Sequence, residues 1–117
     1  MTIIHPVSAV AYPTGTYTAE YRCGVPFVPT QHVKLIATRP REARLELRGI
    51  VNAVGSVTYD FVEGEWECQL SESLSKPLRH RRLRLEKLEY DSDGDSPHVS
   101  VHIFGIGNVR VSLKRIN

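Results

Sequence analysis

The chain has 117 residues, the usual length of a single domain, with 41% hydrophobic and 24% charged residues. These fractions are ordinary for a globular protein and exclude a disordered chain. The formal net charge of +2 is too small by itself to indicate nucleic-acid binding, which usually gathers a larger excess into one patch. No run reaches the roughly 18 to 20 apolar residues of a membrane-spanning helix, so no membrane span is expected.

The N-terminal residues do not have the pattern of a secretory signal, because no basic start precedes a long apolar run and two prolines interrupt the segment. Cys23 and Cys68 are the only cysteines and share no short spacing. We therefore expect a cytoplasmic protein with both thiols reduced, and a disulfide between them is the alternative. We divide the chain into an N-terminal arm, residues 1–13, and a single all-β domain, residues 14–117.

Alternation of apolar and polar side chains predicts strands along most of the chain, because successive side chains of a strand point to opposite faces. In the N-terminal half, strands are predicted at Thr16–Cys23, His32–Thr38 and Glu42–Val51. The segment Gly24–Thr30 contains two prolines and is predicted to bend. A turn is expected at Arg39–Arg41, where Pro40 disfavours helix at the residue before it.

The alternation continues beyond a turn predicted at Asn52–Gly55. A strand containing Val57, Tyr59 and Phe61 is followed by a tight turn at Glu63-Gly64. The remaining predicted strands are Glu65–Ser71, His98–Phe104 and Val109–Leu113, with a turn at Gly105–Asn108 between the last two.

The segment Ser73–Tyr90 is ambiguous. A strand aligns Leu83 with Leu85 but needs a β-bulge near Glu86-Lys87. A helix within 75–89 is the alternative, because the segment is rich in Leu, Arg, Glu and Lys, and Ser75 could cap it. We favour the strand, because the flanking elements are all β.

The predicted fold class is therefore all-β: a single small antiparallel β-barrel, or a barrel-like sandwich, of about eight strands. Consecutive hairpins after Gly15-Thr16-Tyr17 resemble small lipocalin-like barrels, which open on a Gly-x-Trp motif where this chain has Gly15-x-Tyr17.

The loop after the ambiguous segment contains Asp91, Asp93 and Asp95 at alternate positions. Calcium prefers several carboxylate oxygens, and aspartate, serine and glycine are also ordinary turn residues. The surrounding run Leu83–Gly105 resembles the opening of a C2 domain, with Pro97, Val99 and Val101 matching the family's Pro-x-Val-x-Val pattern. That resemblance implies calcium-dependent membrane binding. In C2 domains, however, most strands follow this stretch, whereas only 12 residues follow it here, so we do not assign the chain to the family.

Basic residues concentrate in the stretch 76–87. Nucleic-acid affinity comes largely from neutralised phosphate charge, so Arg79, Arg81, Arg82 and Arg84 are candidate nucleic-acid-binding residues. The stretch lacks the interleaved aromatic side chains on which single-strand binders stack bases.

Five aromatic residues are predicted to share the inner face: Tyr17, Tyr21, Tyr59, Phe61 and Trp66. They form the core of a filled barrel, or line a pocket for a small apolar ligand in a roomier one. His98 and His102 share a strand face, but four residues separate them by roughly 13 Å, so no metal site is expected. No nucleophile motif such as Gly-x-Ser-x-Gly is present, and neither enzyme activity nor a cofactor is expected.

The sequence thus predicts a non-enzymatic interaction module that binds another protein or self-associates as a homo-oligomer. The apolar segment of the arm could add a strand to a neighbouring sheet edge. The alternatives are a small apolar-ligand carrier with an internal cavity and a nucleic-acid-binding protein that uses the basic stretch 76–87.

Overall fold

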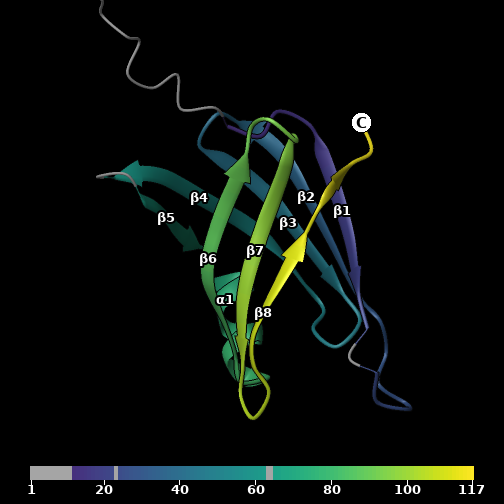
Figure 1. The fold of residues 1–117 in the computed structure, drawn as a ribbon. Coiled ribbons are helices and arrows are strands. Elements are labelled where there is room, and N and C mark those ends of the chain that lie inside the picture. The colour runs from purple at the N-terminus through teal and green to yellow at the C-terminus, as the bar shows by residue number, and fades with distance from the viewer. Residues whose placement is uncertain (1–11, 23, 63–64) are drawn as a thin grey trace, which may run out of the picture.

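The computed structural model describes residues 12–22, 24–62 and 65–117, with the side chains of 61, 62, 65 and 66 left aside (Figure 1). The alternating pattern forms strands, as predicted. In chain order the elements are β1 (Thr16–Tyr21), β2 (Gln31–Arg39), β3 (Glu42–Arg48), β4 (Ala53–Val62), β5 (Glu65–Leu70), α1 (Glu72–His80), β6 (Leu83–Asp91), β7 (Ser96–Ile103), β8 (Gly107–Ser112) and β9 (Lys114–Arg115).

The strands form two antiparallel sheets. The larger sheet has the order β5-β4-β3-β2-β1-β9, and the smaller has the order β6-β7-β8. The chain passes from the larger to the smaller sheet through α1 and returns at Leu113, between β8 and β9. Figure 1 shows the smaller sheet in front of the larger one, with α1 below.

A closed barrel is not found in the described part of the chain. β5 and β6 lie in contact, but no strand pairing joins them. One hydrogen bond between β5 and β6 involves a side chain: the backbone N–H of Leu88 donates to the thiol of Cys68. Because α1 rather than a tight turn connects these two strands, they do not form a hairpin, and the structure is two sheets around one core.

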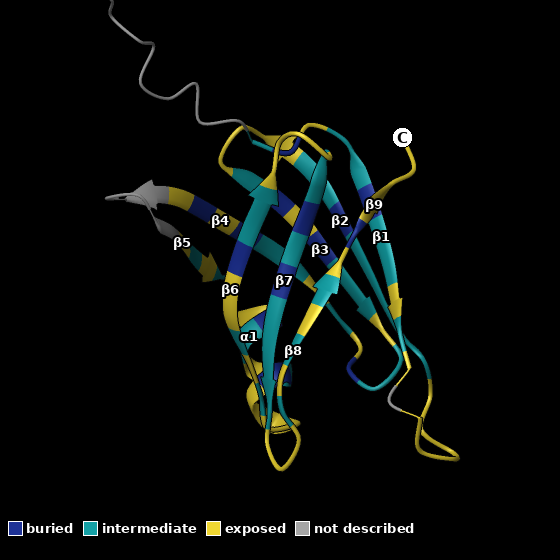
Figure 2. Ribbon diagram, in the orientation of Figure 1, coloured by how far each residue is buried: buried dark blue, intermediate teal, exposed yellow. Residues whose placement is uncertain are grey.

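The core lies between the sheets and receives side chains from both (Figure 2). Tyr17, Leu35 and Leu45 come from the larger sheet, and Leu88 and Val99 from the smaller one. All five were on the apolar face of a predicted strand or of the ambiguous segment. Leu113, at the crossing between the sheets, is also fully buried.

The ambiguous segment contains both kinds of structure, so the preference for a strand was wrong for its first half. Leu74 and Leu78 lie one helical turn apart and both are buried. Ser71 precedes the helix, not Ser75, and its N–H and hydroxyl both bond the backbone of Ser56 in β4. These contacts hold the first turn of α1 against the larger sheet.

The second half of the segment is β6, and the predicted bulge is present. The register with β7 shifts between Leu85 and Lys87, so Glu86 is the extra residue. The bulge lets Leu85 and Leu88 both face the core although they differ in parity.

The turn predicted at Asn52–Gly55 lies earlier, at 49–52. Gly49 adopts a φ of +133°, which favours glycine, and its N–H and C=O both bond the Asn52 side chain. Gly55 instead lies within β4, where a Cβ would collide with Ser71, Ser73 and Leu74. Its missing side chain therefore lets α1 approach the sheet.

Most of the predicted N-terminal arm, together with Cys23 and the turn Glu63-Gly64, lies outside the described residues. Of the arm, Tyr12 stacks on Tyr59 with ring centroids 5.9 Å apart, and Pro13 is buried. No helix in the described part of the chain has both the length and the apolar character needed to cross a bilayer.

Candidate functional site

Several neighbouring segments lie at one end of the molecule, the lower end in Figure 1. We call this the basic end and define it as residues 22, 24–30, 49–52, 76–82 and 104–106. β9 pairs antiparallel with the start of β1. The preceding strand, β8, therefore begins at the end of the molecule where β1 finishes. Contacts join the segments: Gly49 lies against Thr30, and the N–H of Phe104 donates to the carbonyl of Arg82 at 3.3 Å.

The charged side chains of the basic end all have the same sign. Its segments contain no Asp or Glu, and their cations are Arg22, Lys76, Arg79, Arg81 and Arg82. The opposite end carries both signs: the aspartate loop between β6 and β7 and Glu42 at the start of β3 lie there together with Arg39, Arg41 and Arg115. The segments of the basic end are therefore distinguished by having charges of one sign only.

Helix α1 presents its basic residues to solvent. With Leu74 and Leu78 packed inward, the 3.6-residue period places Lys76, Arg79 and His80 on the opposite face, and all three are exposed. Three of the last four helical carbonyls, those of Pro77, Leu78 and Arg79, accept from the N–H groups of Arg81 and Arg82.

The cations of α1 and its following turn differ from those farther along β6 in their ion pairs. Within the described residues, no carboxylate forms an ion pair with Lys76, Arg79, Arg81 or Arg82. Farther along β6 the pattern changes, since Arg84 contacts Glu86 at 2.6 Å and Lys87 contacts Glu89 at 3.7 Å. Among the described residues, α1 and the turn that follows it thus carry four cations in sequence proximity that form no ion pair.

Exposed apolar side chains extend from the same end. Phe104 and Ile106, in the β7–β8 turn, are 68% and 64% exposed, and the guanidinium of Arg82 lies 5.4 Å from the centre of the Phe104 ring. The β1–β2 connection adds Val25, Phe27 and Val28, and Phe27 is fully exposed. Burial of such side chains would be favourable in an apolar environment.

A cleft of about 370 Å³ opens between α1 and the β3–β4 connection. Val51 and Pro77 form its apolar part, and Lys76, His80 and Arg81 supply basic groups. Asn52 also lines it, although its amide already bonds Gly49.

The four predicted nucleic-acid-binding arginines do not form one group. Arg79, Arg81 and Arg82 belong to the basic end, whereas Arg84 lies on β6 and is held by Glu86. The aromatic side chain missing from this stretch in sequence is supplied by Phe104 from the neighbouring hairpin.

No protein-family model, no curated protein and no solved structure matches the chain.

Two of the five predicted apolar-ligand residues lie in the core. Tyr17 and Tyr59 are 0% and 2% exposed, while Tyr21 is half-buried at the end of β1. Burial, followed by the phenols of Tyr17 and Tyr12, raises the pKa of Tyr59 to about 12. The side chains of Phe61 and Trp66 lie outside the described part. A second cleft, beside Tyr59, is lined mostly by charged and polar residues of the opposite end.

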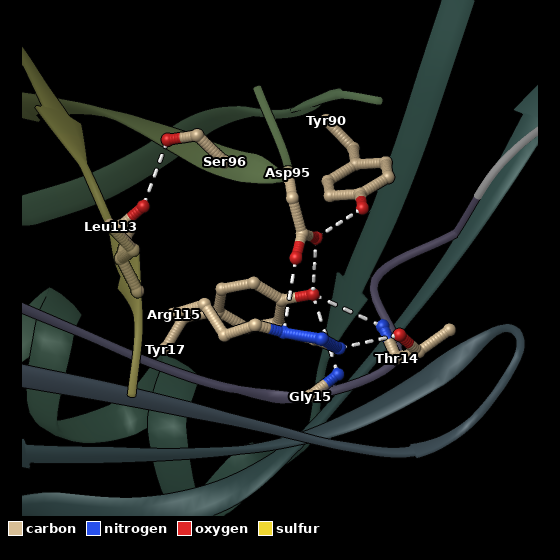
Figure 3. A network of polar contacts seen from close by, with 8 residues as sticks. All are labelled: Thr14, Gly15, Tyr17, Tyr90, Asp95, Ser96, Leu113 and Arg115. Carbon is tan, nitrogen blue, oxygen red and sulfur yellow. Dashed lines mark hydrogen bonds and ion pairs between the residues drawn. The ribbon is translucent and has the colours of Figure 1, made fainter. Parts of the chain in front are cut away.

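Asp95, in the loop considered for calcium, is the centre of a polar network (Figure 3). Its Oδ1 accepts hydrogen bonds from Tyr17 at 2.8 Å and Tyr90 at 2.5 Å, and its Oδ2 contacts Arg115 at 3.0 Å. The donors Tyr90 and Tyr17, together with Arg115, hold the pKa of the Asp95 carboxyl below its ordinary value. The carboxylate joins the two sheets instead of pointing outward.

No group of three or more metal-ligating side chains clusters among the described residues. His98 and His102, which share a strand face, each bond a residue of β8: His98 Nδ1 lies 2.7 Å from Ser112, and His102 Nδ1 lies 2.8 Å from Asn108.

The sequence reasoning missed the apolar part of the site. Phe104, Ile106 and Phe27 were assigned to strand ends, turns and bends without a role. The available signal was the presence of large apolar residues beside glycine and proline in two connections, Gly24–Thr30 and Phe104–Asn108, where polar residues are typical.

Proposed function

We propose that the protein is a non-enzymatic interaction module that docks through its basic end onto the surface of an anionic phospholipid membrane. One observation supports this proposal above the others. Five of the seven exposed large apolar side chains occupy the same end as four cations of α1 and its following turn that form no ion pair within the described part of the chain, and the segments of that end contain no carboxylate.

A membrane surface uses both kinds of side chain. Basic residues near an anionic leaflet each contribute about 1 kcal/mol, and apolar groups enter the boundary between headgroups and acyl chains. Phe27 and Ile106 extend from two separate connections, so both can enter one flat surface while Arg79 and Arg82 lie near the headgroups. The expected cytoplasmic location agrees with this, because the cytoplasmic leaflet is the anionic one.

Nucleic acid, predicted from Arg79, Arg81, Arg82 and Arg84, is the competing anionic partner. Phe104 beside Arg82 offers one stacking surface. However, the branched aliphatic residues Val25, Val28 and Ile106 have no use in base stacking. They favour lipid over nucleic acid.

The test is co-sedimentation of the full chain with phosphatidylserine-containing vesicles and with purely phosphatidylcholine vesicles. We expect binding to the anionic vesicles only, with or without a calcium chelator, because the aspartate loop lies at the opposite end of the domain. A labelled single-stranded oligonucleotide is titrated in parallel.

Two pairs of variants show which end binds. Arg79→Gln/Arg82→Gln should weaken vesicle binding roughly 10- to 30-fold, whereas Arg39→Gln/Lys114→Gln removes the same charge from the opposite end and should have little effect. Ile106→Asn should weaken binding, whereas Ile116→Asn should not, although the two side chains are similarly exposed at 64% and 59%.

Equal losses from both members of each pair would contradict the proposal. Oligonucleotide binding that Arg79→Gln/Arg82→Gln abolishes, without vesicle binding, would replace lipid by nucleic acid as the partner.

A second candidate is association with another protein or with a second copy of the chain through β8. In the described sheet, β8 pairs only with β7. The N–H of Leu113 donates to Pro97, so by alternation the backbone groups of Asn108, Arg110 and Ser112 face the outer edge. Such an edge can accept an added strand. Light scattering decides this: a dimer supports the candidate, and a monomer at high concentration excludes self-association.

A further inference from the structure

We infer that the cleft between α1 and the β3–β4 connection binds a phosphomonoester group, and that its source is the headgroup of an anionic lipid such as phosphatidate. This inference rests on the proposed function and names the headgroup that the basic end selects.

The cleft combines three groups suited to phosphate on one wall. Lys76, His80 and Arg81 come from the last helical turns of α1 and the residue after it, and all three line the opening. Lysine binds phosphate as a point charge and arginine through a planar fork of N–H donors, while an imidazole N–H adds a third donor. Since no carboxylate contacts Lys76 or Arg81 within the described part of the chain, both charges are available.

The opposite wall limits what can enter. Val51 is almost fully buried, and the side chain of Gln31 bonds both its N–H and its carbonyl. The connection is thereby held in place beside Pro77, and the volume of about 370 Å³ accommodates a headgroup.

The C-terminal end of a helix disfavours anions where its carbonyl oxygens lack hydrogen-bond donors. In this helix, the carbonyls of Pro77 and Leu78 accept from the N–H of Arg81, and that of Arg79 accepts from Arg82. Three of the last four helical carbonyls are therefore occupied, and cationic side chains line the cleft beside them.

Charge selects the monoester over the diester. A phosphomonoester carries about −1.5 to −2 charges at neutral pH, because its second pKa is near 6, whereas the phosphodiester of a typical phospholipid or of a nucleic-acid backbone carries one. Three donor side chains that line the same cleft match the more highly charged group with its three terminal oxygens.

The experiment compares vesicles that contain phosphatidate with vesicles that contain enough phosphatidylserine to reach the same surface charge. We expect the full chain to bind phosphatidate vesicles roughly tenfold more tightly. The variant Lys76→Gln/Arg81→Gln should lose this preference. Arg79→Gln/Arg82→Gln removes the same charge outside the cleft and should weaken binding to both vesicles while keeping their ratio. Circular dichroism confirms that each variant is folded.

A second measurement uses soluble ligands and amide NMR shifts. Inorganic phosphate and glycerol 3-phosphate should each shift the amides of Val51 and Asn52 saturably, and Lys76→Gln/Arg81→Gln should abolish the shifts. Shifts without a preference for phosphatidate would overturn the lipid source and assign the cleft to a soluble phosphomonoester.

If phosphate causes no amide shifts and the vesicles show no preference for phosphatidate, the inference is overturned. Binding to phosphatidylserine vesicles would in that case still support the proposed function. Saturable shifts without any vesicle binding would overturn the proposed function and the lipid source together, and support only the phosphate chemistry of the cleft.

Discussion

Tyr17 donates a 2.8 Å hydrogen bond to Asp95 across 78 residues of sequence. Tyr17 belongs to the first strand of the larger sheet, and Asp95 precedes the middle strand of the smaller one. Arg115, in the last strand, lies over the Tyr17 ring at 5.6 Å and contacts the same carboxylate. The interaction connects the two sheets at the end opposite the basic end, where it leaves the docking surface unobstructed.

Asp95→Asn should destabilise the domain at neutral pH by about 1 kcal/mol, a value reduced for solvent screening because the side chain is 36% exposed. The folded-state pKa of Asp95 lies below its ordinary value, so its stabilisation is present above the unfolded-state pKa and is lost as pH falls through the folded-state pKa. Denaturant unfolding at neutral and acidic pH measures this. The difference from wild type should shrink toward low pH.

Asp93→Asn is the matched control for that substitution. Asp93 is exposed in the same loop, and its backbone N–H donates a hydrogen bond to the Asp91 carboxylate. An equal loss in both variants would show that the network around Asp95 adds nothing specific.

Tyr59 should make the domain sensitive to alkali. Because burial raises its pKa from 10.0 to about 12, the folded state favours the neutral phenol. That preference costs nothing below the unfolded-state pKa and reduces stability by up to about 2 to 3 kcal/mol as pH rises from about 10 to 12. Tyr59→Phe should flatten the decline in unfolding free energy over this window, and Tyr21→Phe serves as the control. An unchanged decline in Tyr59→Phe would contradict the prediction.

Leu74→Ala should destabilise the domain by about 2 to 5 kcal/mol, because Leu74 is fully buried between α1 and the sheets. Ile116→Ala removes a similar aliphatic side chain from a site that is 59% exposed and should change stability by less than about 0.5 kcal/mol. Urea unfolding of both variants gives the comparison. A small effect at Leu74 would mean that α1 does not contribute to the core.

Salt should separate the two parts of membrane binding. Raising the ionic strength screens exposed charges and should weaken the binding of wild type to anionic vesicles. Phe27→Ser should bind more weakly at every salt concentration with the same salt dependence, whereas Arg79→Gln/Arg82→Gln should bind with a reduced salt dependence. Ile116→Ser is the control at the opposite end. A changed salt slope in Phe27→Ser would argue against apolar insertion.

Local pattern was sufficient for most strands and for one irregularity. The bulge in β6 followed from the parity of Leu85 and Leu88, because both must reach the same core. The helix was not decided by local pattern. Leucine, arginine and lysine suit a helix, and Leu74 and Leu78 form its apolar face only because β4 presents Gly55 and Ser56 to the start of α1.

The sequence by itself determined a mostly β chain and a basic stretch after residue 75, because alternation and charge are properties of neighbouring residues. Only the tertiary structure decided whether the sheet closes, which arginines have acidic partners, and which apolar residues lie beside them. Phe27 and Phe104 belong to opposite halves of the chain, and the antiparallel register of β1, β8 and β9 brings their connections to one end. The position of these two connections at one end results from long-range strand pairing, which no local pattern encodes.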